Sequence, residues 1–121
     1  MERFLKQGKG WRLGWNPQAE VYKGLVGAED WAMELTEAEL RDFCRLLIEL
    51  AEIMTGMAGE LVEQERLACE ASSDLLWLEA EGFPHDYTLR LIVQQGRCGE
   101  GNWTSEAVPE LVRAAQLPGV F

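Results

Sequence analysis

A long amphipathic segment in the middle of the chain constrains the fold most. It opens with Thr36 and Glu39, which have the spacing of a capping box, where each side chain binds a free backbone N–H at the start of a helix. Apolar residues then recur in steps of three and four, at Leu40, Phe43, Leu47, Leu50, Met54, Met57 and Leu61. This periodicity predicts one amphipathic helix over residues 36–63. Gly56 and Gly59 each cost about 1 kcal/mol inside a helix, so they indicate a kink, an early end or a close backbone contact.

Glycine and proline divide the residues before this helix into short extended segments. We predict four strands there, over residues 2–6, 11–15, 21–26 and 31–35. The connections between them are of hairpin length, so the strands are expected to form an antiparallel sheet.

The residues after the helix repeat this plan. We predict strands over residues 67–71 and 74–81, a loop over residues 82–86 and a third strand over residues 87–94. A short fourth strand then ends at Trp103. Thr104 or Ser105 then begins a last helix, which tolerates Pro109 only in its first turn. The two helix starts also match, because residues 35–40 and 103–108 both hold an apolar residue, a threonine and a second apolar residue four positions later.

Together these patterns predict an α+β fold built by duplication. We expect one domain over residues 1–121, made of pseudo-repeats 1–63 and 64–121, each with four antiparallel strands and a helix. The two helices are expected to pack between the repeats. Further apolar residues widen the helix surface beyond its main stripe: Leu46, Ile48 and Ile53. A surface this wide can pack against a second helix or another subunit, and we prefer a monomer with an internal pseudo-twofold axis to a homodimer.

Charge narrows the class of partner. The formal net charge of −10 argues against a general polyanion binder, because nucleic-acid affinity rests largely on neutralising phosphates. Residues 1–24 differ from the rest, since five basic and two acidic side chains give them a net charge of +3 and leave −13 for the remainder. Binding of an anionic partner by residues 1–24 therefore remains an alternative.

Composition also indicates a compartment. No segment reaches the roughly 20 consecutive apolar residues that span a bilayer, and the first residues meet Gly8 before a secretory core could form. Three cysteines, Cys44, Cys69 and Cys98, are an odd number without short paired spacing. We expect a cytosolic protein that binds no membrane and whose reduced thiols serve as small buried hydrophobes.

Three segments carry a resemblance to a known family: residues 11–17 (WRLGWNP), 30–36 (DWAMELT) and 101–111 (GNWTSEAVPEL). They resemble a small cyanobacterial family catalogued as domain of unknown function 1818, and the likeness extends over almost the whole chain. The family has no established activity, so the resemblance implies no substrate or catalytic residue. It implies a fold similar to the units of Whirly proteins and of the eukaryotic single-strand-binding transcriptional coactivator. Those proteins arrange two units about a twofold axis and bind single-stranded nucleic acid on their sheets.

Residues that could support catalysis or metal binding are sparse. His85 is the only histidine, which excludes a two-histidine site, and its place beside Asp86 in a loop is typical of an exposed side chain. Cys44, Cys69, Cys98 and His85 lack the short ligand spacing of structural zinc sites. Glu79 and Glu81 share one face of a strand, but they could act as an acid/base pair only if burial shifted one pKa. We therefore predict no cofactor, no metal and no enzymatic activity.

One surface pattern does suggest binding. Strand alternation turns Leu76, Leu78 and Ala80 toward the core, and it turns Trp77 and its odd-numbered neighbours outward. An exposed tryptophan near arginines can stack on bases or hold a protein. A basic-aromatic patch would contain Arg12, Lys23, Trp77, Arg90 and Arg97. The competing interpretation is that a helix of the same chain covers Trp77.

The sequence thus favours a non-catalytic cytosolic interaction protein that binds a protein partner through the outer faces of its sheets. The first alternative is single-stranded nucleic-acid binding through the five residues of the basic-aromatic patch. The second is an enzyme that uses an unrecognised carboxylate pair.

Overall fold

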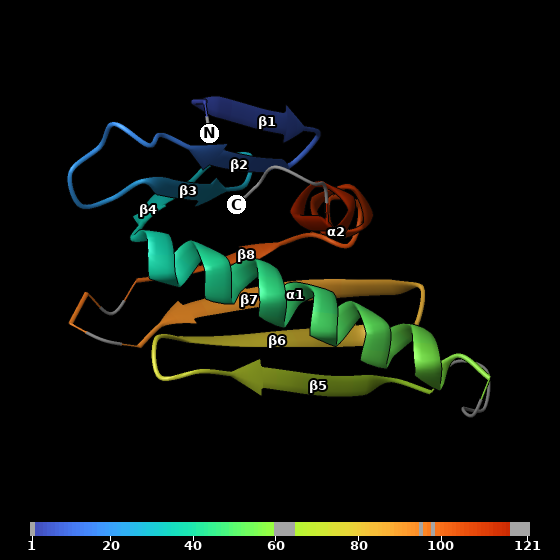
Figure 1. The fold of residues 1–121 in the computed structure, drawn as a ribbon. Coiled ribbons are helices and arrows are strands. Elements are labelled where there is room, and N and C mark those ends of the chain that lie inside the picture. The colour runs from blue at the N-terminus through green and yellow to red at the C-terminus, as the bar shows by residue number, and fades with distance from the viewer. Residues whose placement is uncertain (1, 60–64, 95, 98, 117–121) are drawn as a thin grey trace.

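The computed structural model describes residues 2–59, 65–94, 96–97 and 99–116, and it confirms the duplicated α+β architecture (Figure 1). The first repeat contains β1 (Phe4–Gly8), β2 (Trp11–Trp15), β3 (Gly24–Gly27), β4 (Ala32–Leu35) and α1 (Glu37–Met57). The second contains β5 (Leu67–Ser72), β6 (Leu76–Phe83), β7 (Asp86–Val93), β8 (Glu100–Trp103) and α2 (Val108–Gln116). Each set of four strands forms one antiparallel sheet in sequence order.

The capping box is present, but α1 is shorter than predicted. The Thr36 hydroxyl accepts a hydrogen bond from the Glu39 backbone N–H at 3.2 Å, and the Thr36 N–H donates to the Glu39 carboxylate at 2.8 Å. The helix ends at Met57 and Ala58 caps it, so Gly56 precedes an early end. A Cβ on Gly56 would contact nothing within 4 Å, which argues against a close backbone approach there. The predicted extension through Gly59 was wrong, and residues 60–63 lie outside the described residues.

The predicted loop over residues 82–86 was also wrong. Phe83 and Asp86 pair directly, so only two residues connect β6 to β7. Gly82 adopts φ 141° inside the strand, and a Cβ there would lie 2.6 Å from the Asp86 carbonyl oxygen. The glycine therefore permits a close cross-strand approach rather than ending the strand.

Several other elements begin later in the sequence than predicted. The first strand covers Phe4–Gly8 rather than residues 2–6, and the fourth begins at Ala32 rather than at residue 31. The third strand begins at Gly24 rather than at residue 21. The strand predicted from residue 74 begins at Leu76, because the Ser73 hydroxyl accepts hydrogen bonds from the backbone N–H groups of Leu75 and Leu76 and forms a turn. The last helix begins at Val108, after a turn over residues 104–107, and Pro109 does lie in its first turn.

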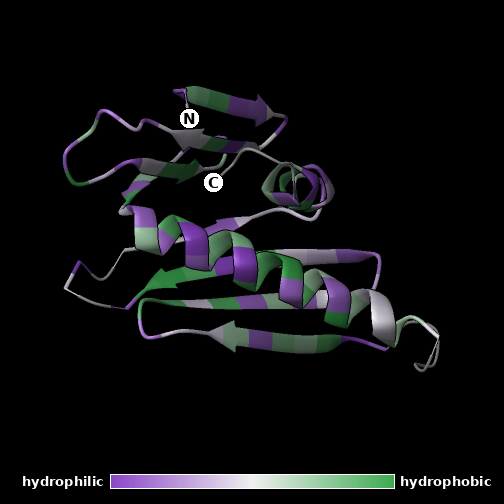
Figure 2. Cartoon of the chain, in the orientation of Figure 1, coloured by the Kyte–Doolittle hydropathy of each residue, from purple (hydrophilic) through white to green (hydrophobic). Residues whose placement is uncertain are grey.

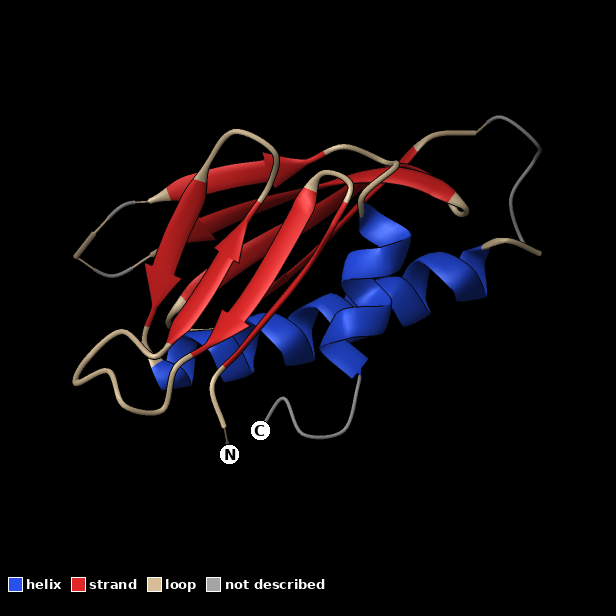
Figure 3. Cartoon of the chain, turned by 90° about the horizontal axis from the view of Figure 1, so that it is seen from above, coloured by secondary structure: helices blue, strands red, loops and turns tan. Residues whose placement is uncertain are grey.

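Each helix lies mainly against the sheet of the other repeat. The α1 helix packs chiefly on β5 and β6, whereas α2 packs chiefly on β2, and the two helices contact each other. Figure 3 shows the strands on one side of the molecule and both helices on the other. Hydrophobic and hydrophilic residues alternate along α1, as Figure 2 shows, and its buried residues include Leu46, while Ile53 stays 41% exposed. Buried residues of both repeats form a common hydrophobic cluster.

Two tryptophans join the repeats by exchanging hydrogen bonds. The Trp31 indole donates to the Asn102 carbonyl oxygen at 3.0 Å, and the Trp103 indole donates to the Gly27 carbonyl oxygen at 2.8 Å. The two rings meet edge to face with their centroids 4.9 Å apart. Gly101 lies directly under Trp31, where a Cβ would collide with the ring. We call this pair of tryptophans, with Gly27 and Gly101, the inter-repeat junction.

Candidate functional site

The outward side of the second sheet carries the surface that the alternation predicted. Leu78, Leu91 and their inward neighbours are buried, whereas Trp77, Arg90 and Ile92 lie on the opposite side. Both helices pack on the inward side, and Trp77 is not part of the hydrophobic cluster, so no described helix covers it. We define the outer face of the second sheet by these residues: Glu70, Ser72, Trp77, Glu79, Glu81, Thr88, Arg90, Ile92, Glu100 and Asn102.

Trp77 and Ile92 form the apolar centre of this outer face. They lie directly opposite each other on neighbouring strands, with Glu100 next in the same row. The Trp77 indole donates to the Glu70 carboxylate at 3.1 Å. The Arg90 guanidinium lies 5.8 Å from the centroid of the Trp77 ring and forms an ion pair with Glu100 at 3.5 Å. Neighbouring polar groups thus hold the tryptophan ring, which remains half-buried at the surface.

Carboxylates dominate the charge of this outer face. Its members include four glutamates and one arginine, which gives a net charge of −3 (4 acidic minus 1 basic). Glu70 and Glu79 are direct cross-strand neighbours, and Glu79 lies opposite Arg90 on the next strand. Arg66, just before β5, adds an ion pair with Glu81 at 3.0 Å. The carboxylates therefore surround Arg90, the one arginine of the predicted basic-aromatic patch that lies on this face.

Arg12 has a structural role that the sequence did not reveal. Its half-buried guanidinium donates to the Ala28 carbonyl oxygen at 3.0 Å and to the Trp31 carbonyl oxygen at 2.8 Å. These bonds hold the connection between β3 and β4, next to the inter-repeat junction. Backbone carbonyl groups thus bind the Arg12 guanidinium, which was predicted to contact a binding partner.

Arg97 also binds within the chain. It donates to the Glu34 carbonyl oxygen at 2.6 Å and to the Glu39 carboxylate, and its guanidinium lies 4.6 Å from the centroid of the Tyr22 ring. Glu39 is only 5% exposed, so this contact neutralises a buried carboxylate at the start of α1. Arg97 therefore fixes the connection between β7 and β8 against the first repeat.

Of the five predicted site residues, the structure brings only Trp77 and Arg90 together. Lys23 lies in the connection before β3, where it lines a hollow of about 200 Å³ together with Arg3 and Tyr22. Among the described residues, no contact links Arg12, Lys23 or Arg97 to the Trp77–Arg90 pair. They do not join that pair in one continuous patch.

The residues weighed for catalysis and metal binding are scattered. Within the described ranges, no group of three or more histidine, cysteine, aspartate or glutamate side chains could hold a metal ion. Burial raises the pKa of the Cys44 thiol to about 12, which makes it a poor nucleophile. His85 is exposed in the turn between β6 and β7, and Cys98 lies outside the described residues. No helix in the described part of the chain is long and apolar enough to cross a membrane.

Comparison with known proteins supports the fold and the family. A crystal structure of a protein of unknown function from the DUF155 family of Prochlorococcus sp. NATL2A is similar, with a TM-score of 0.88 and 24% sequence identity. The alignment covers 93% of this chain and 96% of that chain, and at this identity it supports the fold alone. No curated protein matches.

The likeness to Whirly and coactivator units stays a prediction. The match to a family is direct: residues 6–117 match the domain of unknown function DUF1818, so the chain belongs to that family.

Proposed function

We propose that this protein is a non-catalytic binding protein whose outer face on the second sheet holds a protein partner. The observation that carries the proposal is the Trp77–Ile92 pair, an apolar centre surrounded by charged side chains. Protein interfaces commonly have this plan, in which an aromatic anchor at the centre supplies most of the binding energy and a polar rim surrounds it.

The charges of the outer face favour a basic partner. Glu70, Glu79, Glu81 and Glu100 would attract lysine or arginine side chains, and such complementarity raises association rates and excludes acidic competitors. The Trp77 ring could accept a cation on its face or an apolar side chain beside Ile92. We expect a segment with basic and apolar side chains to lie across β6 and β7.

Single-stranded nucleic acid is the weaker alternative. Arg90 beside the Trp77 ring is the arrangement that favours base stacking. However, Glu100 pairs with that arginine and Glu70 binds the indole, so an approaching phosphate would meet carboxylates. Catalysis by an unrecognised carboxylate pair has no further support, because Arg66 engages Glu81 and Arg90 lies opposite Glu79.

A site-specific cross-linking experiment tests the proposal. A photoreactive amino acid replaces Ser72, which lies beside Trp77 on the outer face, and in a matched control it replaces exposed Gln18 of the first repeat. We expect one basic protein from the source cells to cross-link at position 72 and not at position 18, with no sensitivity to nucleases.

Purified partner then provides the quantitative test. Trp77→Ala should weaken its binding at least tenfold, about 1.4 kcal/mol, and Glu79→Lys should weaken it further because it reverses a charge. The control Glu49→Lys changes an exposed carboxylate on α1 and should leave the affinity unchanged. Nuclease-sensitive cross-links, or equal affinity of Trp77→Ala and the unaltered protein, would contradict the proposal.

A further inference from the structure

The outermost strands of the two sheets differ in what lies beside them. β4 and β8 meet at the inter-repeat junction, where the Trp31 indole bonds to β8 and Gly101 leaves room for the Trp31 ring. β1 and β5 lie at the other ends of their sheets, and among the described residues each pairs with a single strand, β2 or β6. An edge strand with unpaired backbone groups can bind an extended segment of another chain.

β1 is unsuited to such pairing. Lys6 lies on the inward side of this strand, opposite Leu13, and its Nζ atom lies 5.0 Å from the centroid of the Phe4 ring. A charged residue on the inward side of an edge strand opposes pairing with a further strand, because the added strand would bury the charge.

β5 has no such residue. Its sequence, LACEAS, contains no lysine, arginine or proline. Its inward side chains are apolar, and they pack against the common hydrophobic cluster while staying only partly buried: Leu67, Cys69 and Ala71. The outward side chains, Ala68, Glu70 and Ser72, are exposed. The edge of the second sheet therefore lacks the charge that protects the edge of the first.

The turn after β5 determines which backbone groups of this strand are free. The Ser73 N–H donates to the Leu76 carbonyl oxygen at 2.8 Å, so these two residues form a hydrogen-bonded pair. Hydrogen-bonded and non-hydrogen-bonded pairs alternate along an antiparallel ladder. The N–H and C=O groups of Ala68, Glu70 and Ser72 therefore point away from β6, toward the open edge.

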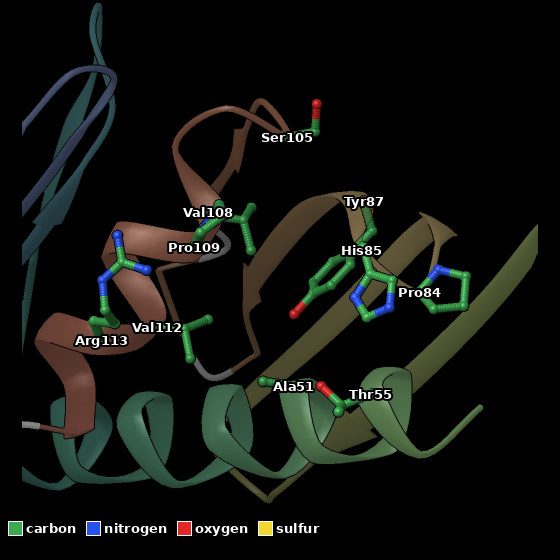
Figure 4. A pocket seen from close by; sticks show the side chains of 10 residues that line it. All are labelled: Ala51, Thr55, Pro84, His85, Tyr87, Ser105, Val108, Pro109, Val112 and Arg113. Carbon is green, nitrogen blue, oxygen red and sulfur yellow. The ribbon is translucent and has the colours of Figure 1, made fainter. Parts of the chain in front are cut away.

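The helix above β5 adds apolar surface to this edge. Ala51 and Thr55 border a cavity of about 260 Å³ between α1 and α2, so they mark the flank of α1 that faces α2 (Figure 4). Ile53 lies two positions from each of them, about 200° around the helix. It therefore faces away from α2, toward the side of α1 on which β5 lies (Figure 1). This exposed isoleucine and the inward side chains of β5 would contact the apolar side of an added strand.

The outward side of β5 favours a basic neighbour. A residue of an added strand opposite Glu70 would lie beside two carboxylates, because Glu70 and Glu79 are cross-strand neighbours. The Trp77 indole already reaches Glu70 at 3.1 Å, which brings the tryptophan ring close to the same position. Lysine or arginine suits this position, since either can pair with the carboxylates and lie against the ring.

We infer that the protein partner adds a strand to β5, with basic side chains on the outward side and apolar side chains on the inward side. This inference rests on the function proposed above and specifies the backbone conformation and residue pattern of that partner. One extended stretch of the partner pairs with Ala68, Glu70 and Ser72, and the residues next to that stretch lie over Trp77 and Ile92.

A synthetic peptide tests the added strand. The probe acetyl-KVKVKVK-amide carries lysines on one side of a strand and valines on the other, and the control acetyl-KKKKVVV-amide has the same composition without alternation. In NMR of the ¹⁵N-labelled protein, we expect saturable shifts along β5 and slower hydrogen exchange at the N–H groups of Glu70 and Ser72. The control peptide should bind at least tenfold more weakly. No saturable binding of the probe, equal binding by both peptides, or unchanged exchange at these two N–H groups would overturn the inference.

Substitutions separate this inference from the proposed function. Ala68→Pro removes one N–H at the open edge, where an edge strand tolerates proline, and should weaken both the probe and the purified partner at least tenfold. The control Ala68→Val keeps the N–H and should have little effect, and an unchanged Trp103 indole signal shows that each variant is folded. If Trp77→Ala weakens the partner and Ala68→Pro does not, the inference fails and the proposed function stands. If Trp77→Ala has no effect on the partner, the proposed function itself fails.

Discussion

The outward sides of the two sheets differ far more than their inward sides do. Both inward sides carry large apolar residues in register, such as Leu13 opposite Val26 and Leu78 opposite Leu91. Facing outward, the first sheet has Leu5, Gly14 and Leu25 in one row, whereas the second has Trp77 and Ile92 among carboxylates. The common core constrains the inward residues of both repeats, while nothing in the core constrains the outward ones. A difference confined to the outward side is therefore where a specific function of one repeat can be sought.

The largest expected loss of stability comes from truncating buried residues on the inward side of each sheet. Leu13→Ala and Leu78→Ala each remove a fully buried side chain, so each should lower the free energy of unfolding by about 2–5 kcal/mol. Urea denaturation measures both. A large loss in only one variant would show that the two sheets do not depend equally on the common core.

Substitution of two arginines of the second repeat should lower the free energy of unfolding by smaller and unequal amounts. Arg97→Ala removes the partner of buried Glu39 and a bond to the Glu34 carbonyl, so we expect a loss of about 2 kcal/mol. Arg90→Ala removes an exposed ion pair with Glu100 and should cost less than about 1 kcal/mol. Urea denaturation of the two variants under the same conditions gives the comparison, and similar losses would contradict it.

The inward side should also respond to pH. Because the pKa of Cys44 is about 12 in the folded protein and about 9 for an unperturbed thiol, its stabilising contribution is complete below pH 9 and is lost as pH rises toward 12. We expect the free energy of unfolding to fall by about 1 kcal/mol between pH 9 and pH 10. In Cys44→Ala most of this slope should disappear, leaving the smaller contribution of Tyr87, whose pKa is also raised by burial. An unchanged slope would assign the titration to another group.

The smallest effects belong to the outward sides. Trp77→Ala and Leu25→Ala should each change the free energy of unfolding by no more than about 1 kcal/mol, because neither residue belongs to the buried core. Only Trp77→Ala should reduce partner binding. If Leu25→Ala reduced the same binding, the partner would extend to the first sheet.

Local signals allowed much of the fold to be predicted from the sequence. The capping box at Thr36 and Glu39 and the inward alternation at Leu76, Leu78 and Ala80 need only neighbouring residues, and both are confirmed. Gly82 was interpreted as a break because its backbone φ and the approach of Asp86 are not visible in a single segment.

The candidate site was less predictable because its contacts are long-range. Arg12 and Arg97 were assigned to a surface patch, but their acceptors belong to segments 16 to 63 positions away. The exchange of helices between the sheets is likewise a property of tertiary packing.

The exchange of helices has a consequence for the origin of the chain. Because α1 covers the sheet of the second repeat and α2 covers that of the first, a single repeat on its own would leave the apolar side of its sheet in water. An ancestor with only one repeat would then have been stable as two identical copies that covered each other. Fusion of two such copies into one chain would remove the dependence of their stability on protein concentration. Such a fusion would also allow the outward sides of the two sheets to differ in sequence. The second sheet could then acquire Trp77 while the first sheet did not.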